Sequence, residues 1–138
     1  HPTTMHMISK YITRAVLMTA FFALFLVTPA VRAAESSFGQ NVGTITLMDK
    51  LDSDDAKQVV LRAVASRRLE LRESTDGKIV AYHARGSNTL TLTVTYDDKK
   101  IEFFAVGTSR KGGLPMGWIE NIKKDVNVFL VQQLAMKK

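Results

Sequence analysis

The sequence predicts an α+β fold: a two-layer sandwich in which a four-stranded antiparallel meander carries two helices on one face, in the order αββββα. Three observations lead to this prediction. Residues 69–106 hold four β-prone runs, and the connections between them are so short that successive strands must be antiparallel neighbours. An amphipathic helical pattern precedes these runs, and another follows them. Both helices need an apolar surface to cover, and a sheet with alternating side chains offers one such face.

Residues 1–33 are predicted to be a signal peptide with a few upstream residues, and they lie outside this domain. Lys10 and Arg14 precede an uncharged, mostly apolar run of 16 residues at 15–30, and a small-residue cleavage site ends at Ala33. A transmembrane anchor is the alternative interpretation, but 16 residues are short for a span of about 20. We therefore expect an exported protein, periplasmic or secreted, that meets a membrane only through this leader before cleavage.

Composition and charge limit the class of partner. The chain has 138 residues and a net charge of +6, with 19 basic and 13 acidic residues. Three of the basic residues and none of the acidic ones fall in residues 1–33, so the remainder has 16 against 13 and a net charge of about +3. This modest excess gives no reason to expect a nucleic-acid partner. The sequence contains no cysteine, so it holds neither a disulfide nor a lipid-carrying cysteine.

The single α+β domain is expected to span residues 52–138, after a segment at 34–51 that is either a flexible start or a short edge strand. The domain begins with a helix that ends near Ser66. Asp52 or Ser53 can accept a hydrogen bond from the first turn of this helix, and the acidic residues that follow suit the positive end of its dipole. The apolar stripe of the helix consists of Ala56, Val59, Val60, Ala63 and Val64.

Four strands follow, separated by turn sequences such as Asp76-Gly77, in which glycine tolerates the positive φ angles of tight turns. The third strand alternates four threonines with apolar residues, so it has a hydroxyl face and an apolar face. In the fourth strand, Phe104 and Val106 lie on the face opposite to Ile101. The four strands are expected at 69–73, 78–84, 89–96 and 100–106.

A loop with four glycines leads from the last strand to a second amphipathic helix, which is expected to begin at Trp118. This loop is the first candidate site. Arg110 and Lys111 stand beside Gly112 and Gly113, so the loop can bring positive charge and free backbone N–H groups to an anion, and the nearby helix N-terminus adds a favourable dipole. The glycine spacing is not that of a phosphate-binding loop. The alternative interpretation is a solvated crossover between strand and helix.

The hydroxyl face of the third strand is the second candidate site. Thr91 and Thr93 lie on this face, and Phe104 joins them if the strand register is right. Such a flat surface can bind a peptide, a glycan or a second copy of the chain. Threonine also favours strands for reasons of packing alone, so the alternative interpretation is a solvated face.

Structural residues follow one another in a recognisable order over roughly residues 55–130: a helix, then Gly77-x-Ile79-x-Ala81, Arg85, Val94-x-Tyr96, Ile101-x-Phe103 and Trp118-Ile119-x-Asn121-Ile122. In this order the chain resembles a family of small exported bacterial proteins, many of them lipoproteins, for which no function is assigned. The chain departs from the family pattern in having no lipid-carrying cysteine, and in having residues 114–117 where members have a histidine and a tyrosine. The resemblance implies this fold and export, and it implies no site.

No residue pattern indicates catalysis or metal binding, so we expect no enzyme, no metal site and no cofactor. His83 is the one histidine of the predicted domain. A lone histidine without further ligands at metal spacing does not make a zinc site, and we interpret it as a residue on a face of the sheet. The acidic runs at 52–55 and 97–98 are explained by helix and turn formation.

The function expected from the sequence is that of a small exported, non-enzymatic domain that binds a partner at the cell envelope. The partner is an envelope or extracellular protein, a peptide or an envelope polymer, and a homodimer through the open sheet face is a further expectation. The alternative is a binder of an anionic ligand through the basic loop at 109–113. Ionic strength separates the two, because a charge-driven contact weakens with added salt.

Overall fold

Five strands and two helices make up the part of the chain that the computed structural model describes, residues 37–137, in the order βαββββα. The predicted α+β class is confirmed, whereas the predicted number of strands is one too small. The predicted signal peptide lies outside the described residues. The elements are β1 (Gln40–Thr46), α2 (Ser53–Ser66), β2 (Glu70–Thr75), β3 (Lys78–Arg85), β4 (Asn88–Tyr96), β5 (Lys100–Thr108) and α3 (Met116–Ala135).

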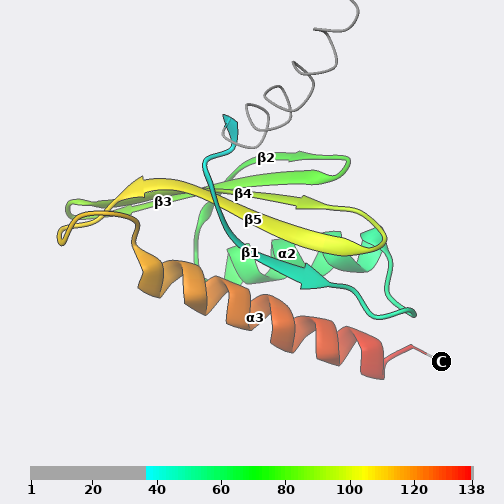
Figure 1. Cartoon of the computed structure of the whole chain (residues 1–138). Coiled ribbons are helices and arrows are strands. Elements are labelled where there is room, and N and C mark those ends of the chain that lie inside the picture. The colour runs from blue at the N-terminus through cyan, green and yellow to red at the C-terminus, as the bar shows by residue number, and fades with distance from the viewer. Residues whose placement is uncertain (1–36, 138) are drawn as a thin grey trace, which may run out of the picture. The chain divides into compact units, whose positions relative to one another are not determined.

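The five strands form one antiparallel sheet in the order β1-β5-β4-β3-β2. Strands β2 to β5 are the predicted meander, and the additional strand β1 lies at the edge beside β5, with Ile45 opposite Ile101 (Figure 1). Of the two alternatives for residues 34–51, the edge strand is therefore confirmed over 40–46. The sequence signal for β1 is weak because this strand pairs with the last strand of the chain rather than with a neighbour, so no hairpin turn marks it.

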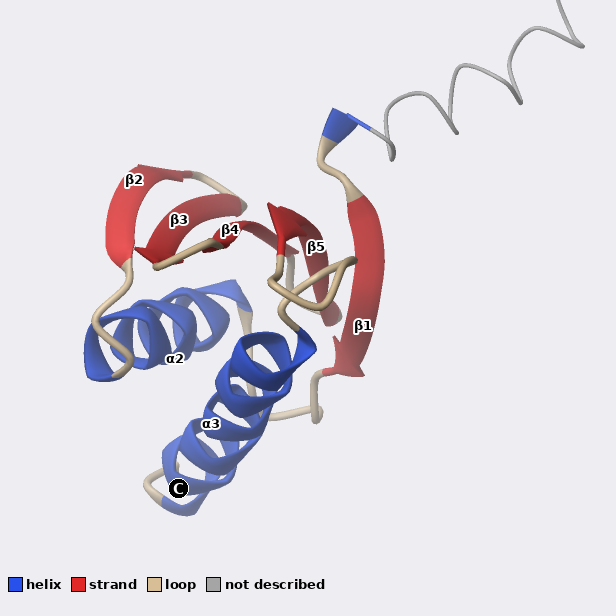
Figure 2. Ribbon diagram, turned by 90° about the vertical axis from the view of Figure 1, so that its left-hand side faces the viewer, coloured by secondary structure: helices blue, strands red, loops and turns tan. Residues whose placement is uncertain are grey.

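Both helices lie on the same face of the sheet, as predicted, and they pack against each other (Figure 2). Helix α2 starts at a capping box: Asp52 Oδ1 accepts the Asp55 N–H at 3.1 Å, and Asp55 Oδ2 accepts the Asp52 N–H at 3.0 Å. All five residues of its predicted stripe are buried. Helix α3 begins at Met116, two residues before the predicted start. Among residues 37–137, no helix is long and apolar enough to cross a membrane.

The hydrophobic core lies between the two helices and the apolar face of the sheet. Residues that pair across antiparallel strands share a face, and Ile79, Val94 and Phe103 form one such buried row. Burying a side chain of this size stabilises the fold by about 1.5–3 kcal/mol. The largest completely buried side chains are Phe103, Ile79, Leu90, Leu92, Ile101, Ile119, Ile122, Val59, Val60, Val94 and Val126.

Polar contacts join the two helices at both ends of α2. At its N-terminal end, the Asp55 carboxylate accepts hydrogen bonds from Gln133 Nε2 at 2.8 Å and from Lys137 Nζ at 2.8 Å. At its C-terminal end, Arg67 donates two hydrogen bonds to the Asp125 carboxylate, at 2.6 and 3.1 Å. These contacts hold α3 in place against α2, and thereby against the sheet.

Candidate functional site

One end of the sheet carries acidic residues whose carboxylates serve the fold. Successive turns of a meander lie at alternate ends, so the β2–β3 and β4–β5 turns share this end. Asp97 Oδ1 accepts the N–H groups of Lys99 and Lys100 at 2.7 and 2.9 Å, and these bonds hold the pKa of Asp97 below its usual value. Asp98 Oδ1 accepts the Ser53 N–H at 2.9 Å. The prediction that these acidic residues belong to turns is confirmed.

The opposite end of the sheet carries cations, and we call it the basic end. The β3–β4 turn and the loop after β5 meet there, because the Arg110 N–H donates to Asn88 Oδ1 at 2.8 Å. Neither the turn nor the loop contains an acidic residue. Arg85, Arg110 and Lys111 are exposed, and none of them forms an ion pair within the part of the chain that the structure describes. Their charge is therefore available to an anion from outside.

The loop after β5 is held in shape by its own hydrogen bonds. Ser109 Oγ donates to the Gly112 carbonyl at 2.9 Å, and the Gly112 N–H donates to the Ser109 carbonyl at 2.9 Å. Gly112 and Gly113 have φ angles of +92° and +73°, a region that glycine adopts without strain. The N–H groups of Lys111 and Gly113 have no partner among the described residues, whereas those of Arg110 and Gly112 are used. Of the four N–H groups at residues 110–113, two are thus free to meet an anion.

A cavity of about 470 Å³ lies between this loop and the N-terminus of α3, and we call it the loop cavity. Arg110, Lys111, Asn88 and Gly117 contribute to its lining. No side chain in residues 37–137 caps the start of α3, and its first turn contains no acidic residue. The positive end of the helix dipole therefore adds to the charge of the two basic side chains.

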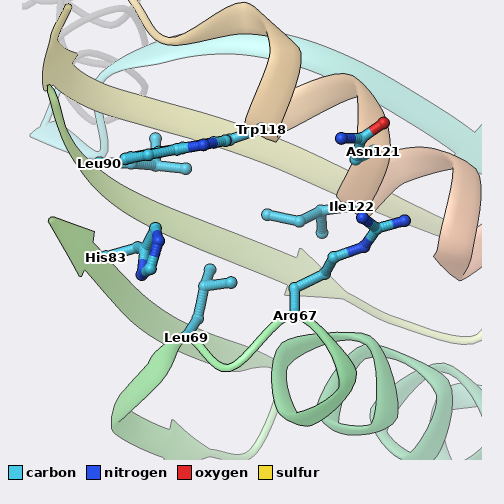
Figure 3. Close-up of a pocket in the computed structure, with 7 residues that line it drawn as sticks. All are labelled: Arg67, Leu69, His83, Leu90, Trp118, Asn121 and Ile122. Carbon is cyan, nitrogen blue, oxygen red and sulfur yellow. The ribbon is translucent and has the colours of Figure 1, made fainter. Parts of the chain in front are cut away.

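A second cavity, of about 260 Å³, lies among the C-terminal end of α2, the first turns of α3 and the strands β3 and β4 (Figure 3). We call it the aromatic cavity. Apolar and polar side chains both line it. They are Arg67, Leu69, His83, Leu90, Trp118, Asn121 and Ile122.

Two aromatic rings meet in the aromatic cavity. His83 pairs with Leu90 on the side of the sheet that the helices cover, so it lies on a sheet face, as the sequence indicates, but on the covered one. Trp118 comes from the first turn of α3 and packs against the core. The two ring centroids are 4.5 Å apart and the ring planes stand at 64°, an edge-to-face arrangement (Figure 3). Both residues are half-buried, so the cavity opens to solvent past them.

The aromatic cavity holds polar groups that the protein leaves unpaired. The His83 imidazole, the Trp118 indole N–H and the Asn121 amide have no hydrogen-bond partner among the described residues, and none of these atoms is sealed from solvent. Arg67 binds Asp125 through Nε and Nη2, which holds the pKa of Asp125 below its usual value and balances the guanidinium charge. Neutral donors and acceptors on apolar walls are the usual composition of a small-molecule site.

The two cavities are neighbours. Asn88 lines the loop cavity and Leu90 the aromatic cavity, and these residues are two positions apart on one face of β4, about 7 Å by the strand rise. Arg85 follows His83 in the same way on β3. The first turn of α3 contributes residues to both cavities. A ligand larger than one ring can therefore contact both.

The other face of the sheet contains the second predicted site, and its centre is covered. The register places Thr93 opposite Phe104, so the predicted register is confirmed. The ring of Phe38, which precedes β1, lies 5.5 Å from the ring of Phe104. Phe104 is 4% exposed and Thr93 is 5% exposed. The expectation that these two residues form an open surface therefore does not hold, while Thr91 beside them is half-buried.

Gly39 sends the chain across this face. Its φ angle is +103°, and a Cβ at this position would lie 2.4 Å from the Ala105 carbonyl oxygen, so glycine is required by conformation and by space. The resulting bend lets Phe38 pack on Phe104 instead of continuing β1 along β5. The composition of residues 34–43 does not predict that Phe38 covers Phe104, because Phe104 lies far along the chain.

Sequence reasoning predicts no residue of the aromatic cavity as a site residue: it interprets His83 as a residue on a sheet face and does not consider Arg67 or Asn121 as site residues. Asn121 follows Trp118 by three positions, a spacing that places both on one face of a helix, and this is the signal that could reveal it. Arg67 stands at the end of α2, where a basic residue is readily explained by the helix dipole alone. The side chains meet because α2 and α3 pack together.

The structure thus shows an α+β fold with two neighbouring cavities, the loop cavity and the aromatic cavity, at one end of its sheet. No family model, no curated protein and no solved structure matches this chain. Within residues 37–137, no three potential metal-ligating side chains gather at one point.

Proposed function

We propose that the chain is an exported, non-enzymatic binding module that holds an anionic group of a cell-envelope polymer at the basic end of its sheet. One observation carries this proposal. Asp97 and Asp98, at the other end of the sheet, accept backbone N–H groups of the domain, whereas the exposed Arg85, Arg110 and Lys111 at the basic end have no ion-pair partner in the described range. Charged side chains that stabilise no fold contact are suited to binding from outside.

The shape of the basic end supports an anion rather than a flat apolar partner. The loop cavity places Arg110 and Lys111 beside the positive end of α3. The free N–H groups of Lys111 and Gly113 add donors without further charge. An anion there receives charge, dipole and hydrogen bonds together, which is the combination that phosphate and sulfate groups use in proteins.

Export is proposed from the sequence pattern of residues 1–33. Binding rather than catalysis is proposed because His83 forms no hydrogen bond with a hydroxyl or carboxylate among the described residues, so it makes no nucleophile–base pair there. Self-association through the outer sheet face receives less support, since Phe38 covers Phe104 at its centre.

The test titrates the full chain with pyrophosphate and measures binding by isothermal titration calorimetry at several sodium chloride concentrations. The double variant Arg110→Ala, Lys111→Ala should bind about tenfold more weakly, as expected for the loss of charge-assisted hydrogen bonds. The matched control Lys50→Ala, Lys57→Ala removes the same charge elsewhere and should stay within about twofold of the parent. Equal weakening in both variants, or binding that salt does not affect, would overturn the proposal.

A further inference from the structure

The proposed function gives no role to the aromatic cavity. We propose that it is a second subsite, which seats one pyranose ring of the same anionic polymer, so that the ligand is an anionic saccharide. This inference rests on the proposed function and names the chemistry of the ligand. It follows from the size of the cavity, its polar groups, its ring geometry and its position.

The volume of the aromatic cavity fits a single ring. Sites for drug-sized molecules measure about 300–1,000 Å³. The aromatic cavity, at about 260 Å³, is just below this range. It therefore has room for one six-membered ring with its substituents.

The polar groups of the aromatic cavity are suited to hydroxyl groups on a ligand. The Asn121 amide both donates and accepts, the Trp118 indole N–H donates, and the imidazole of His83 offers two ring nitrogens, all of them unpaired among the described residues. A hydroxyl group also donates and accepts, so a ring that carries several hydroxyls can satisfy this mixed set from different directions. Leu69 and Leu90 supply apolar walls for the C–H faces of such a ring.

The ring geometry argues against a flat aromatic ligand stacked between His83 and Trp118. A nucleobase or similar ring is held best between parallel faces or flat on one exposed face. Here His83 and Trp118 contact each other edge to face, with planes at 64°, so no parallel slot lies between them (Figure 3). The charge of Arg67 is balanced by Asp125, so the cavity attracts a neutral group rather than the anion itself.

The position of the cavity connects the ring to the anion. Arg85 lies two residues beyond His83 on the same face of β3, about 7 Å away along the strand. Asn88 is separated from Leu90 by the same spacing on β4. A phosphate, sulfate or carboxylate substituent on the seated sugar, or on its neighbour in a chain, can thus meet the cations of the basic end.

The experiment uses the full chain and compares inorganic phosphate with the 6-phosphates of glucose, mannose and N-acetylglucosamine. Calorimetry gives each Kd. Trp118 is the one tryptophan of the chain, so fluorescence excited selectively at tryptophan reports on the aromatic cavity. At least one sugar phosphate should bind about tenfold or more tightly than phosphate and should change the fluorescence, while phosphate should not change it.

Variants separate the two subsites. Asn121→Ala and His83→Phe should remove the advantage of the sugar phosphate and leave phosphate binding unchanged. His83→Phe keeps a ring against Trp118, so the fold is preserved while the ring nitrogens are lost. The matched control Asn127→Ala removes an exposed asparagine from the same helix and should have no effect on either ligand.

The outcomes distinguish the two proposals. If phosphate binds at Arg110 and Lys111 but no sugar phosphate binds more tightly, the saccharide inference is overturned and the proposed function stands. If no phosphate compound binds, the proposed function is overturned, and the three parent sugars without phosphate are titrated against the fluorescence of Trp118. A fluorescence change that Asn121→Ala abolishes then supports the pyranose subsite without the anion site. No fluorescence change with any of the three sugars overturns the pyranose subsite.

Discussion

The buried carboxylate of Asp55 should make the stability of the fold depend on pH in a way that one substitution removes. Asp55 is 3% exposed, and burial opposes its ionisation. Hydrogen bonds from Lys137, from Gln133 and from the Asp52 N–H outweigh this cost and lower the pKa of Asp55 from 3.8 to about 2. A difference of one pKa unit between the folded and the unfolded chain corresponds to about 1.36 kcal/mol. Ionised Asp55 therefore contributes about 2 kcal/mol to the free energy of unfolding.

The sign of the effect follows from the direction of the shift. Because the pKa of Asp55 is lower in the folded than in the unfolded chain, the stabilisation is complete above about pH 4 and is lost as the pH falls through about 2. The variant Asp55→Asn cannot ionise. It should be about 2 kcal/mol less stable than the parent at pH 7, and the two proteins should converge near pH 2.

Urea unfolding followed by the fluorescence of Trp118 measures this difference at each pH. The control is Asp54→Asn, which removes the same charge from the same helix turn at an exposed position and should cost well under 1 kcal/mol. The reasoning is refuted if Asp55→Asn costs no more than the control at pH 7. It is equally refuted if the gap between Asp55→Asn and the parent persists at pH 2.

Two further substitutions test contacts that hold the domain together. Phe38→Ala removes a ring from the outer sheet face and should lower the free energy of unfolding by about 1–2 kcal/mol, measured in urea, because Phe104 loses its cover. Asp125→Asn should destabilise by about 1 kcal/mol at pH 7. The hydrogen bond from Arg67 lowers the pKa of Asp125, so this difference should fade in acid, and a difference that does not depend on pH would contradict the assignment.

Local patterns explain which parts of the fold are predictable from sequence. The N-cap of α2 at Asp52, the turn at Asp97 and the alternation of β4 each depend on residues close together in the chain, and all three occur as predicted. Strand β1 is ambiguous because its partner is not its neighbour. Its pairing with β5 depends on a register that no turn sets.

The same difference between local and long-range patterns applies to the candidate site. The basic loop is visible in the sequence because Arg110 and Lys111 are consecutive, next to two glycines. The aromatic cavity is not, since Arg67, His83 and Trp118 come from three elements that meet only after the helices pack on the sheet. For the same reason, the hydrogen bond from Gln133 to Asp55, 78 positions apart, cannot be predicted from the sequence around either residue.

The pairing of β1 with β5 also sets an order of assembly. Strands β2 to β5 can form hairpins within microseconds of each other, because their turns are short. Asn41 and Glu102, whose side chains meet across the β1–β5 pair, are 61 positions apart, and a contact of such high sequence separation forms slowly. Among the five described strands, β1 comes first in the chain and is therefore the last to be incorporated. In an exported chain, as we propose this one to be, β1 would cross the membrane before β5 and would stay unpaired until β5 has followed.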